Sequence, residues 1–452
     1  METVNRRKIS EIQEREDASY RNKNPKSYEI YQQTKANMFS GVPMHWMADC
    51  LSPFPTYFKE AHGAHVTDVD DNDFIDLCLG GSGSLFGYAN PKIVEAVSYQ
   101  IAHGATSVMP TEDAYYVGFG LQRIFGLPFW QVTVSASEAN RTALRLCRIL
   151  TKRHNVLVFK YCYHGTVDEA WEASIDVIKP ASENGVQIGT MDMASTTRVV
   201  EFNDIDALEK SLLDEQVACV LTEPVITTAN IVHPSPGFHE ALRELTKKTK
   251  TLLIMDETQT VGTGYGGYSR INNLEPDIMV LGKPMAGGIP VGLLGMSQAF
   301  SKRVADELFY LGSHEHLGMG GTLAGSPIQM KAIRATVEHV MTEDNYGIML
   351  RRADQLQEGM ERVIADYRLP WSVLRLGSRL ELYCLPEPPN TATEAMNAQD
   401  IELESCLNIY AHNRGVMLSP YSNTAVACPV LTKEDVDKHN QVFESFIQEV
   451  CN

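Results

Sequence analysis

The chain has 452 residues, 44% hydrophobic and 21% charged, and its 57 acidic against 39 basic residues give a formal net charge of -18. An acidic surface disfavours nucleic acid and anionic membranes as partners, and no stretch approaches the roughly 20 apolar residues that span a bilayer. The cysteines are scattered without a CxxC pair. They are typical of reduced thiols, so we expect a cytoplasmic protein without a metal site.

The N-terminal part predicts a helical arm, an irregular segment and a hairpin. Residues 1–37 are polar and expected to be helical, whereas residues 38–63 are rich in Pro, Met and aromatic residues. Ala64–Leu79 then alternates apolar and polar residues around Asp70, Asp71 and Asn72, a turn composition that predicts a β-hairpin.

From about residue 90 to 300, short apolar runs alternate with segments of helical length such as Ala139–Lys152 and Gly237–Lys250. The apolar runs are Gln131–Val134, Val156–Phe159, Val217–Thr222, Thr251–Met255 and Ile278–Leu281. This alternation predicts an α/β fold with a mostly parallel sheet covered by helices. Ligands of such sheets bind at the carboxyl ends of the strands.

The pattern changes after about residue 335. A long helix over Asp344–Asp366 is followed by a strand over Arg379–Leu385, a helix over Ile401–Asn413, a strand over Gly415–Leu418 and a helix over Lys433–Cys451. We expect residues 1–75 to form an arm and part of a small domain, residues 76–334 a large domain, and residues 335–452 a smaller α+β domain.

Two charged residues follow apolar runs. A lone loop lysine is usually exposed, but Lys283 lies between the apolar runs Ile278–Leu281 and Ile289–Leu294, which favours burial and nucleophilic chemistry. Asp256 ends an apolar run, and a buried carboxylate needs a cationic or hydrogen-bonding partner. A protonated pyridine nitrogen would be one partner, although metal sites, nucleotide sites and ordinary strand ends share this pattern.

Other polar residues also follow the predicted strands. Ser135, Ala136 and Ser137 precede a helix, where they either cap it or bind a phosphate. Tyr163 stands where an aromatic ring would stack on a flat ligand, although a packed core tyrosine is the commoner explanation. Asn140 begins an Asn-Arg-Thr glycosylation sequon, which we discount because it lies on a predicted helix.

Six short motifs occur in one order: Ser-x-Ser-Glu-Ala at 135–139, Tyr-His-Gly at 163–165, Glu-Pro at 223–224, Asp-Glu at 256–257, Gly-Lys at 282–283 and Gly-Thr at 321–322. This order resembles the class III pyridoxal-phosphate-dependent aminotransferases of fold type I, over about residues 35–440. The subgroup is that of glutamate-semialdehyde aminomutase and the β-amino-acid and amine (omega) transaminases. The resemblance implies a sheet of the seven-stranded type in the large domain.

The resemblance also implies roles for residues. Lys283 would bind pyridoxal 5'-phosphate covalently and move protons, and Asp256 would pair with the pyridine nitrogen. Thr322 would bind the phosphate of a neighbouring subunit, which implies a homodimer or a larger assembly with sites at the interface. Ser137 and the amide of Ala136 would hold the phosphate of their own subunit. The whole set of cofactor-binding residues is Ser135, Ala136, Ser137, Tyr163, His164, Glu223, Asp256, Thr258, Gln259, Lys283 and Thr322.

Departures from the family shape the expected substrate. Ala136 replaces the usual glycine. Phe39–Met47 lacks the arginine that grips a carboxylate in many relatives, which leaves His45, Arg414 or a more remote arginine for that role. We expect an apolar substrate pocket, lined by Met44, Trp46, Met47, Gly81 and Phe86.

The same departures favour one reaction. Gly81 stands near the position of an aromatic residue in the aminomutase, and Ser419–Thr424 lacks that enzyme's acid. The sequence therefore favours an amine (omega) transaminase that passes an amino group from an amine or amino acid to a keto acceptor such as pyruvate. An aminomutase or epimerase of the same fold, or a β-amino-acid transaminase, is the alternative.

Overall fold

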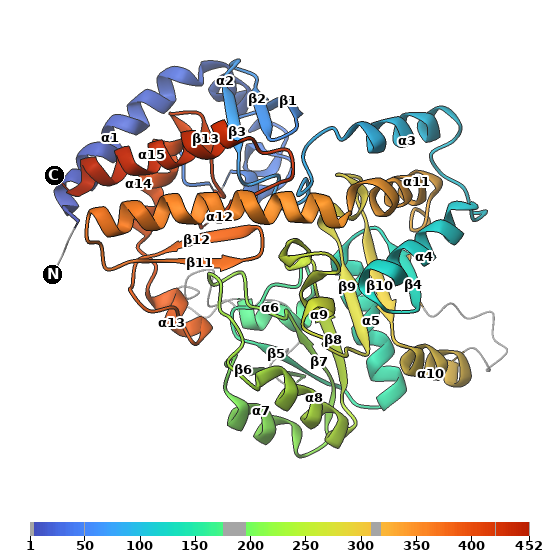
Figure 1. The fold of residues 1–452 in the computed structure, drawn as a ribbon. Coiled ribbons are helices and arrows are strands. Elements are labelled where there is room, and N and C mark those ends of the chain that lie inside the picture. The colour runs from blue at the N-terminus through green and yellow to red at the C-terminus, as the bar shows by residue number, and fades with distance from the viewer. Residues whose placement is uncertain (1–3, 49, 175–195, 309–317, 421, 452) are drawn as a thin grey trace. The chain divides into compact units, whose positions relative to one another are not determined.

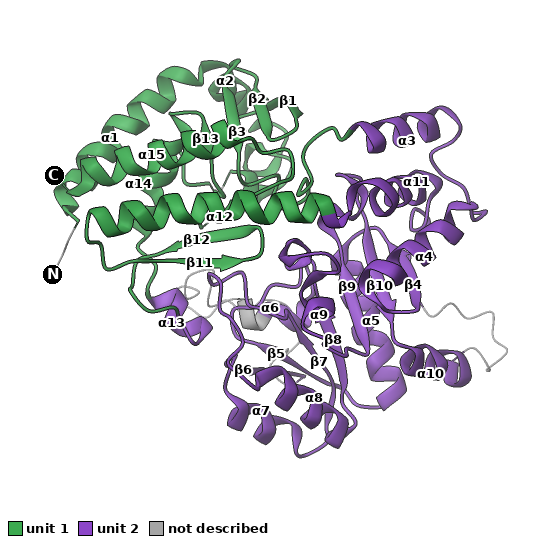
Figure 2. Cartoon of the chain, viewed as in Figure 1, with its two compact units in different colours: residues 1–90, 344–388, 398–452 green, residues 91–343, 389–397 purple. Residues whose placement is uncertain are grey.

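The computed structural model describes residues 4–48, 50–174, 196–308, 318–420 and 422–451. The chain divides into two compact units (Figure 2): unit 1 comprises residues 1–90, 344–388 and 398–452, and unit 2 comprises residues 91–343 and 389–397. Within the described residues, no helix is both long and apolar enough to cross a membrane.

In the described part of the chain, unit 2 is built on a seven-stranded sheet with the order β4-β10-β9-β8-β7-β5-β6 (Figure 1). The strands are β4 (Phe129–Thr133), β5 (Asn155–Phe159), β6 (Thr197–Val200), β7 (Val217–Thr222), β8 (Leu252–Asp256), β9 (Ile278–Leu281) and β10 (Gly292–Met296). Neighbouring strands run parallel except where β10 pairs with β4 and β9. The helices are α3 (Pro91–Ala102), α4 (Asp113–Phe125), α5 (Ala136–Thr151), α6 (Asp168–Ser174), α7 (Ile205–Leu212), α8 (Phe238–Thr249), α9 (Gly267–Ile271), α10 (Gln298–Leu308), α11 (Pro327–Ala335) and α13 (Ala392–Asn397).

The central strands of this sheet form its core. Every residue of β7, β8 and β9 is buried, and such continuous apolar sequences are typical of parallel strands covered on both faces. Helix α5 packs against several of the strands and buries Ala139, Ala143 and Leu146. The core therefore fixes the carboxyl ends of β7, β8 and β9 next to one another.

The prediction of a mostly parallel, helix-covered sheet is confirmed. Val217–Thr222 and Ile278–Leu281 agree residue for residue with β7 and β9. Helix α5 begins earlier than predicted, because the side chain of Ser135 caps it. Strands β6 and β10 are absent from the sequence-based prediction. The first is a short edge strand, and Gly292 and Gly295 obscure the strand pattern of the second.

Unit 1 contains two small sheets in its described residues, with the orders β1-β2-β3-β13 and β11-β12-β14. Their strands are β1 (Phe58–His62), β2 (His65–Asp68), β3 (Asp73–Asp76), β11 (Ser372–Leu376), β12 (Arg379–Tyr383), β13 (Val416–Met417) and β14 (Ala425–Val426). The helices are α1 (Arg6–Lys23), α2 (Pro25–Thr34), α12 (Glu343–Asp366), which begins one residue before the unit boundary, α14 (Ile401–His412) and α15 (Lys433–Cys451). The hairpin predicted within Ala64–Leu79 is confirmed as the antiparallel pair β2 and β3.

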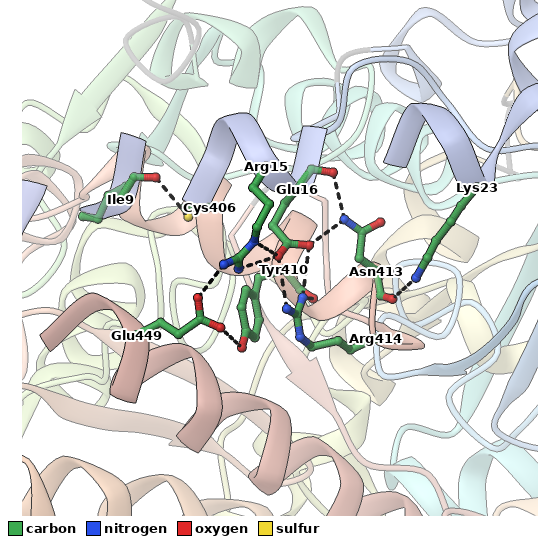
Figure 3. Close-up of polar contacts among 9 residues, drawn as sticks. All are labelled: Ile9, Arg15, Glu16, Lys23, Cys406, Tyr410, Asn413, Arg414 and Glu449. Carbon is green, nitrogen blue, oxygen red and sulfur yellow. Dashed lines mark hydrogen bonds and ion pairs between the residues drawn. The ribbon is translucent and has the colours of Figure 1, made fainter. Parts of the chain in front are cut away.

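A buried carboxylate connects the N-terminal helix α1 to the region around α14 (Figure 3). Glu16 is only 3% exposed and forms ion pairs with Arg15 at 2.7 Å and Arg414 at 3.1 Å. The side-chain amide of Asn413 donates to the backbone carbonyl of Glu16 at 2.9 Å and to its carboxylate at 2.8 Å. Burial acts to raise the pKa of Glu16, but Arg414, Asn413 and Arg15 hold it below its usual value. Arg414, one candidate for binding a substrate carboxylate, is thus engaged by Glu16.

Candidate active site

The residues singled out from the sequence lie at the strand ends of unit 2. Because β10 runs antiparallel to both β4 and β9, β4 points in the same direction as the parallel strands. The carboxyl ends of these strands therefore meet at one edge of the sheet. That edge carries Ser135, Ala136 and Ser137 after β4, Tyr163 and His164 after β5, Glu223 after β7, Asp256 at the end of β8, and Lys283 after β9.

Asp256 is the central carboxylate of this edge and is 3% exposed. Its Oδ2 accepts hydrogen bonds from Asn140 Nδ2 at 2.8 Å and His164 Nδ1 at 2.9 Å. Its Oδ1 accepts the backbone N–H of Thr258 at 3.0 Å. Three donors thus converge on one buried carboxylate, the arrangement that stabilises its charged form.

The electrostatics of this cluster favour an ion pair. Burial acts to lower the pKa of His164, but Cys162 and Asp256 raise it well above its usual value. Burial acts to raise the pKa of Asp256, but His164, Thr258 and Asn140 hold it below its usual value. We therefore treat the pair as an imidazolium and a carboxylate at neutral pH. Burial also raises the pKa of Glu223, against the opposing effect of the nearby His164.

Ser135 and Ser137 have different roles at the start of α5. Ser135 Oγ accepts the N–H of Glu138 at 3.2 Å, so Ser135 is the N-cap. Ser137 Oγ accepts the N–H of Thr166 at 3.0 Å and joins α5 to the loop after β5. A Cβ on Gly165, whose φ is +77°, would lie 1.9 Å from Ser137 Oγ, so only glycine permits this approach. The N-terminus of α5 is the kind of helix end that binds phosphate.

Lys283 has an unusual backbone conformation. It begins a short 3-10 helix, η6 (Lys283–Ala286), and its φ of +51° lies in the left-handed region. Such a conformation costs a non-glycine residue about 1–2 kcal/mol and persists where the surroundings impose it. A Cβ on the preceding Gly282 would lie 2.9 Å from Ala136 Cβ and 3.6 Å from Thr258 Cγ2. The start of η6 therefore lies beside Ala136 and Thr258.

The remaining predicted residues of unit 2 differ in exposure. Tyr163, Thr258 and Gln259 are partly buried, and burial raises the pKa of Tyr163. Thr322 is exposed. Its neighbour Gly321 lies near α5, because an added Cβ there would be 4.0 Å from Glu138 Oε1.

Asn140 is a site residue that sequence reasoning missed. It is fully buried, and its amide donates to both Asp256 Oδ2 and the carbonyl of His164. The available signal was a polar residue between the buried Ala139 and Ala143, on the apolar side of an amphipathic helix. Its burial also argues against glycosylation of the sequon that begins at Asn140.

The predicted substrate residues lie in unit 1. Met44 is 51% exposed and Trp46 is partly buried. A Cβ on Gly81 would meet nothing within 4 Å. Phe86 is only 4% exposed, and its ring packs edge-on against Tyr346 with centroids 5.5 Å apart. Phe86 therefore belongs to the interior of unit 1. Tyr421 belongs to Ser419–Thr424, the segment that lacks the acid of the aminomutase, and lies outside the described residues.

Comparison with known proteins identifies the family. The profile of the family described as "Aminotransferase class-III" matches residues 47–448. The chain belongs to the class III aminotransferases. It is a pyridoxal-phosphate-dependent enzyme of fold type I, as its six ordered motifs predict.

Comparison with four proteins, one of them a variant, shows which members of the family this enzyme is similar to. A glutamate-1-semialdehyde-aminomutase from Pseudomonas aeruginosa PAO1 has 42% identity, with 99% of each chain covered and a TM-score of 0.94. A lysine-to-alanine variant of a Pseudomonas aeruginosa PAO1 protein described in the same way, with the same identity, was solved in complex with PMP. Glutamate-1-semialdehyde 2,1-aminomutase 1 of Staphylococcus carnosus is 29% identical over 94% of this chain and 99% of its own. An omega-transaminase from Sphaerobacter thermophilus shares the fold at 24% identity, 94% and 98% coverage and a TM-score of 0.83.

The residues present fit pyridoxal phosphate. Among the described residues, Asp256 Oδ1 accepts only the N–H of Thr258, and the Thr258 hydroxyl is buried without a hydrogen-bond partner. Gly282 and Gly165 keep space beside Ala136 and Ser137, at the end of α5 that favours an anion. An anionic carboxylate, a helix N-terminus and a lysine at the same edge of the sheet suit a pyridinium ring, a phosphate and an aldehyde.

Proposed function

We propose that this class III enzyme is an aminomutase, which moves an amino group between neighbouring carbons of one substrate. Glutamate 1-semialdehyde, or a related amino aldehyde, is the proposed substrate. The observation that carries the proposal is the 42% identity, over 99% of both chains, to a protein described as a glutamate-1-semialdehyde-aminomutase. The proposal departs from the amine transaminase that the sequence favours, because the omega-transaminase from Sphaerobacter thermophilus is only 24% identical and supports the fold alone.

The site residues have complementary tasks in such a reaction. Bound pyridoxal phosphate supplies an electron sink next to the carbon that carries the amino group. Asp256, charged and held by Asn140 and His164, would keep a proton on the ring nitrogen. Lys283 Nζ would take a proton from one substrate carbon and return it to the neighbouring carbon, which is positioned acid–base catalysis. The N-terminus of α5, with Ser137, would hold the phosphate.

The direct test is a reaction with one substrate. The purified enzyme, prepared separately in its pyridoxal and pyridoxamine forms, is incubated with glutamate 1-semialdehyde and no keto acceptor. We expect the amino group to move from carbon 2 to carbon 1 over many turnovers, as followed by NMR, without stimulation by pyruvate. If turnover requires pyruvate, and the amino aldehyde alone is left unchanged by both forms, the aminomutase proposal is wrong.

Transamination is the second candidate, and the environment of the arginines favours it. Phe39–Met47 contains no arginine, and Arg414 is paired with Glu16. An enzyme that prefers apolar amines has no need of a carboxylate-binding arginine. A panel of aryl-alkyl amines, β-amino acids and α-amino acids with pyruvate separates the amine transaminase from the β-amino-acid transaminase. If any of these amino donors, supplied together with pyruvate, is turned over faster than the amino aldehyde alone, transamination is favoured.

We also infer that the enzyme is a homodimer that associates through unit 2. Large apolar side chains are exposed there, with Val108 at 95%, Met109 at 73%, Tyr115 at 65%, Phe119 at 58% and Leu323 at 55%. Exposed apolar surface on this scale is typical of an interface. The exposed Thr322, next to Leu323, would then reach the phosphate of the partner subunit. Analytical ultracentrifugation tests this inference, and a monomer at micromolar concentration would contradict it.

A further inference from the structure

Asn140 is the buried polar residue at the centre of an otherwise apolar helix face. It is 0% exposed, and its Nδ2 donates to the backbone carbonyl of His164 at 3.2 Å and to Asp256 Oδ2 at 2.8 Å. One amide group thus connects α5, the loop after β5 and the end of β8.

The orientation of this amide is determined by its partners. Both are acceptors, so a rotated amide would place its own oxygen against two other oxygens. In the observed orientation, Asn140 Oδ1 is buried and has no hydrogen-bond partner among the described residues. A buried unsatisfied acceptor is costly. An apolar residue would avoid this cost, which indicates that the two donated hydrogen bonds are what this position requires.

We propose that Asn140 is a positioning residue for the cofactor. It holds Oδ2 of Asp256 on the side of His164 and leaves Oδ1, which accepts only the N–H of Thr258 within the described chain, to the pyridine nitrogen. Without Asn140, the carboxylate would turn about its side-chain bonds and bind the ring nitrogen less well. This inference rests on the cofactor and holds for an aminomutase and a transaminase alike.

The chain offers a matched control for the test. Asn413, in unit 1, also donates through one amide nitrogen to a backbone carbonyl and a buried carboxylate, both of Glu16 (Figure 3). Its Oδ1 is likewise without a hydrogen-bond partner in the described part of the chain. Asn140→Leu and Asn413→Leu therefore remove the same hydrogen bonds in two different places. Thermal unfolding of the two apoenzymes measures the structural cost of each change.

The decisive readouts are cofactor affinity and the spectrum of the bound cofactor. Apoenzyme is titrated with pyridoxal phosphate, and the visible absorption of the holoenzyme is followed against pH. For Asn140→Leu we expect the Kd to rise about tenfold or more, since loss of a hydrogen bond to a buried charge has an effect of this size. We also expect the pH midpoint of the absorption to move by about half a unit or more. For Asn413→Leu, the Kd should stay within about twofold of the wild-type value, and the pH midpoint should stay within about 0.2 units of it.

A second variant covers the case in which Asn140→Leu does not fold. Asn140→Asp keeps the volume of the side chain but places an acceptor against Asp256, so we expect a larger loss of cofactor affinity. If a folded Asn140 variant binds pyridoxal phosphate with the wild-type Kd and the wild-type pH midpoint, the proposal is wrong. It is also wrong if Asn413→Leu weakens cofactor binding as much as Asn140→Leu does.

Discussion

Replacement of Asp256 by asparagine tests the electrostatics at the centre of the site. All three partners of this carboxylate are donors, namely Asn140, His164 and the N–H of Thr258. An asparagine offers one oxygen and one NH2 group, so in either orientation at least one donor faces another donor. The change also removes one member of a buried ion pair, which costs about 3–5 kcal/mol in well-buried pairs. We expect Asp256→Asn to lower the free energy of unfolding of the apoenzyme by about 3 kcal/mol near pH 6.

The size of this loss should depend on pH. The folded-state pKa of His164 is raised well above its usual value, so its contribution to stability is complete below the unfolded-state pKa of about 6.5. That contribution is lost as the pH rises through the folded-state pKa. Asp256 has a lowered pKa, and its contribution is complete above the unfolded-state pKa of about 3.9. The difference between wild type and variant should therefore be largest between about pH 5 and 6.5 and shrink towards pH 9.

Denaturant unfolding of the apoenzymes, followed by circular dichroism at several pH values from 5.5 to 8.5, measures this difference. Asp113→Asn is the control, because Asp113 is 1% exposed and pairs with a lysine, Lys331, and an arginine, Arg334, instead of a histidine. Its loss of stability should be nearly constant with pH. An equally constant loss in Asp256→Asn would refute the assignment of an ion pair between Asp256 and His164. Turnover of the holoenzyme variant should also fall by about a hundredfold or more.

Three other changes test Lys283, the proposed phosphate site at the N-terminus of α5, and the proposed dimer interface. Lys283→Ala should remove the visible absorption of covalently bound cofactor and lower turnover by at least about a hundredfold, with unchanged circular dichroism; retained absorption would reject the assignment. Gly165→Ala should weaken cofactor binding, because its Cβ would lie 1.9 Å from Ser137 Oγ. Gly237→Ala is the control and should leave cofactor binding unchanged, because Gly237 has a similar φ of +84° but open space around it. Equal Kd values in the two variants would contradict this prediction. Phe119→Asp should give a monomer in ultracentrifugation and reduce cofactor affinity, and an unchanged dimer would place the interface elsewhere.

The sequence predicts the strand ends well and the contacts between them poorly. Lys283 and Asp256 follow continuous apolar runs, and such runs reveal a buried strand without reference to any other part of the chain. The partners of Asp256 are a different matter. Asn140 and His164 lie 116 and 92 residues away from it in the sequence. Only the packing of α5 against the sheet, and the placement of β5 next to β7 and of β7 next to β8, brings them together. For the same reason, the engagement of Arg414 by Glu16 could not be predicted.

The choice between aminomutase and transaminase depends on residues whose backbone the sequence does not reveal. The four consecutive residues from Leu79 to Ser82 have φ values of +50°, +59°, +64° and +68°. The buried carboxylate of Asp76 holds this turn, because it accepts the N–H of Cys78 at 2.7 Å and that of Leu79 at 2.9 Å. An aromatic residue at Gly81 would need the same left-handed conformation, at a cost of about 1–2 kcal/mol. The difference from the aminomutase at this position therefore involves the backbone as well as the volume of a side chain. For this reason the missing aromatic residue is weak evidence against an aminomutase, and the similarity along the whole chain is the stronger argument.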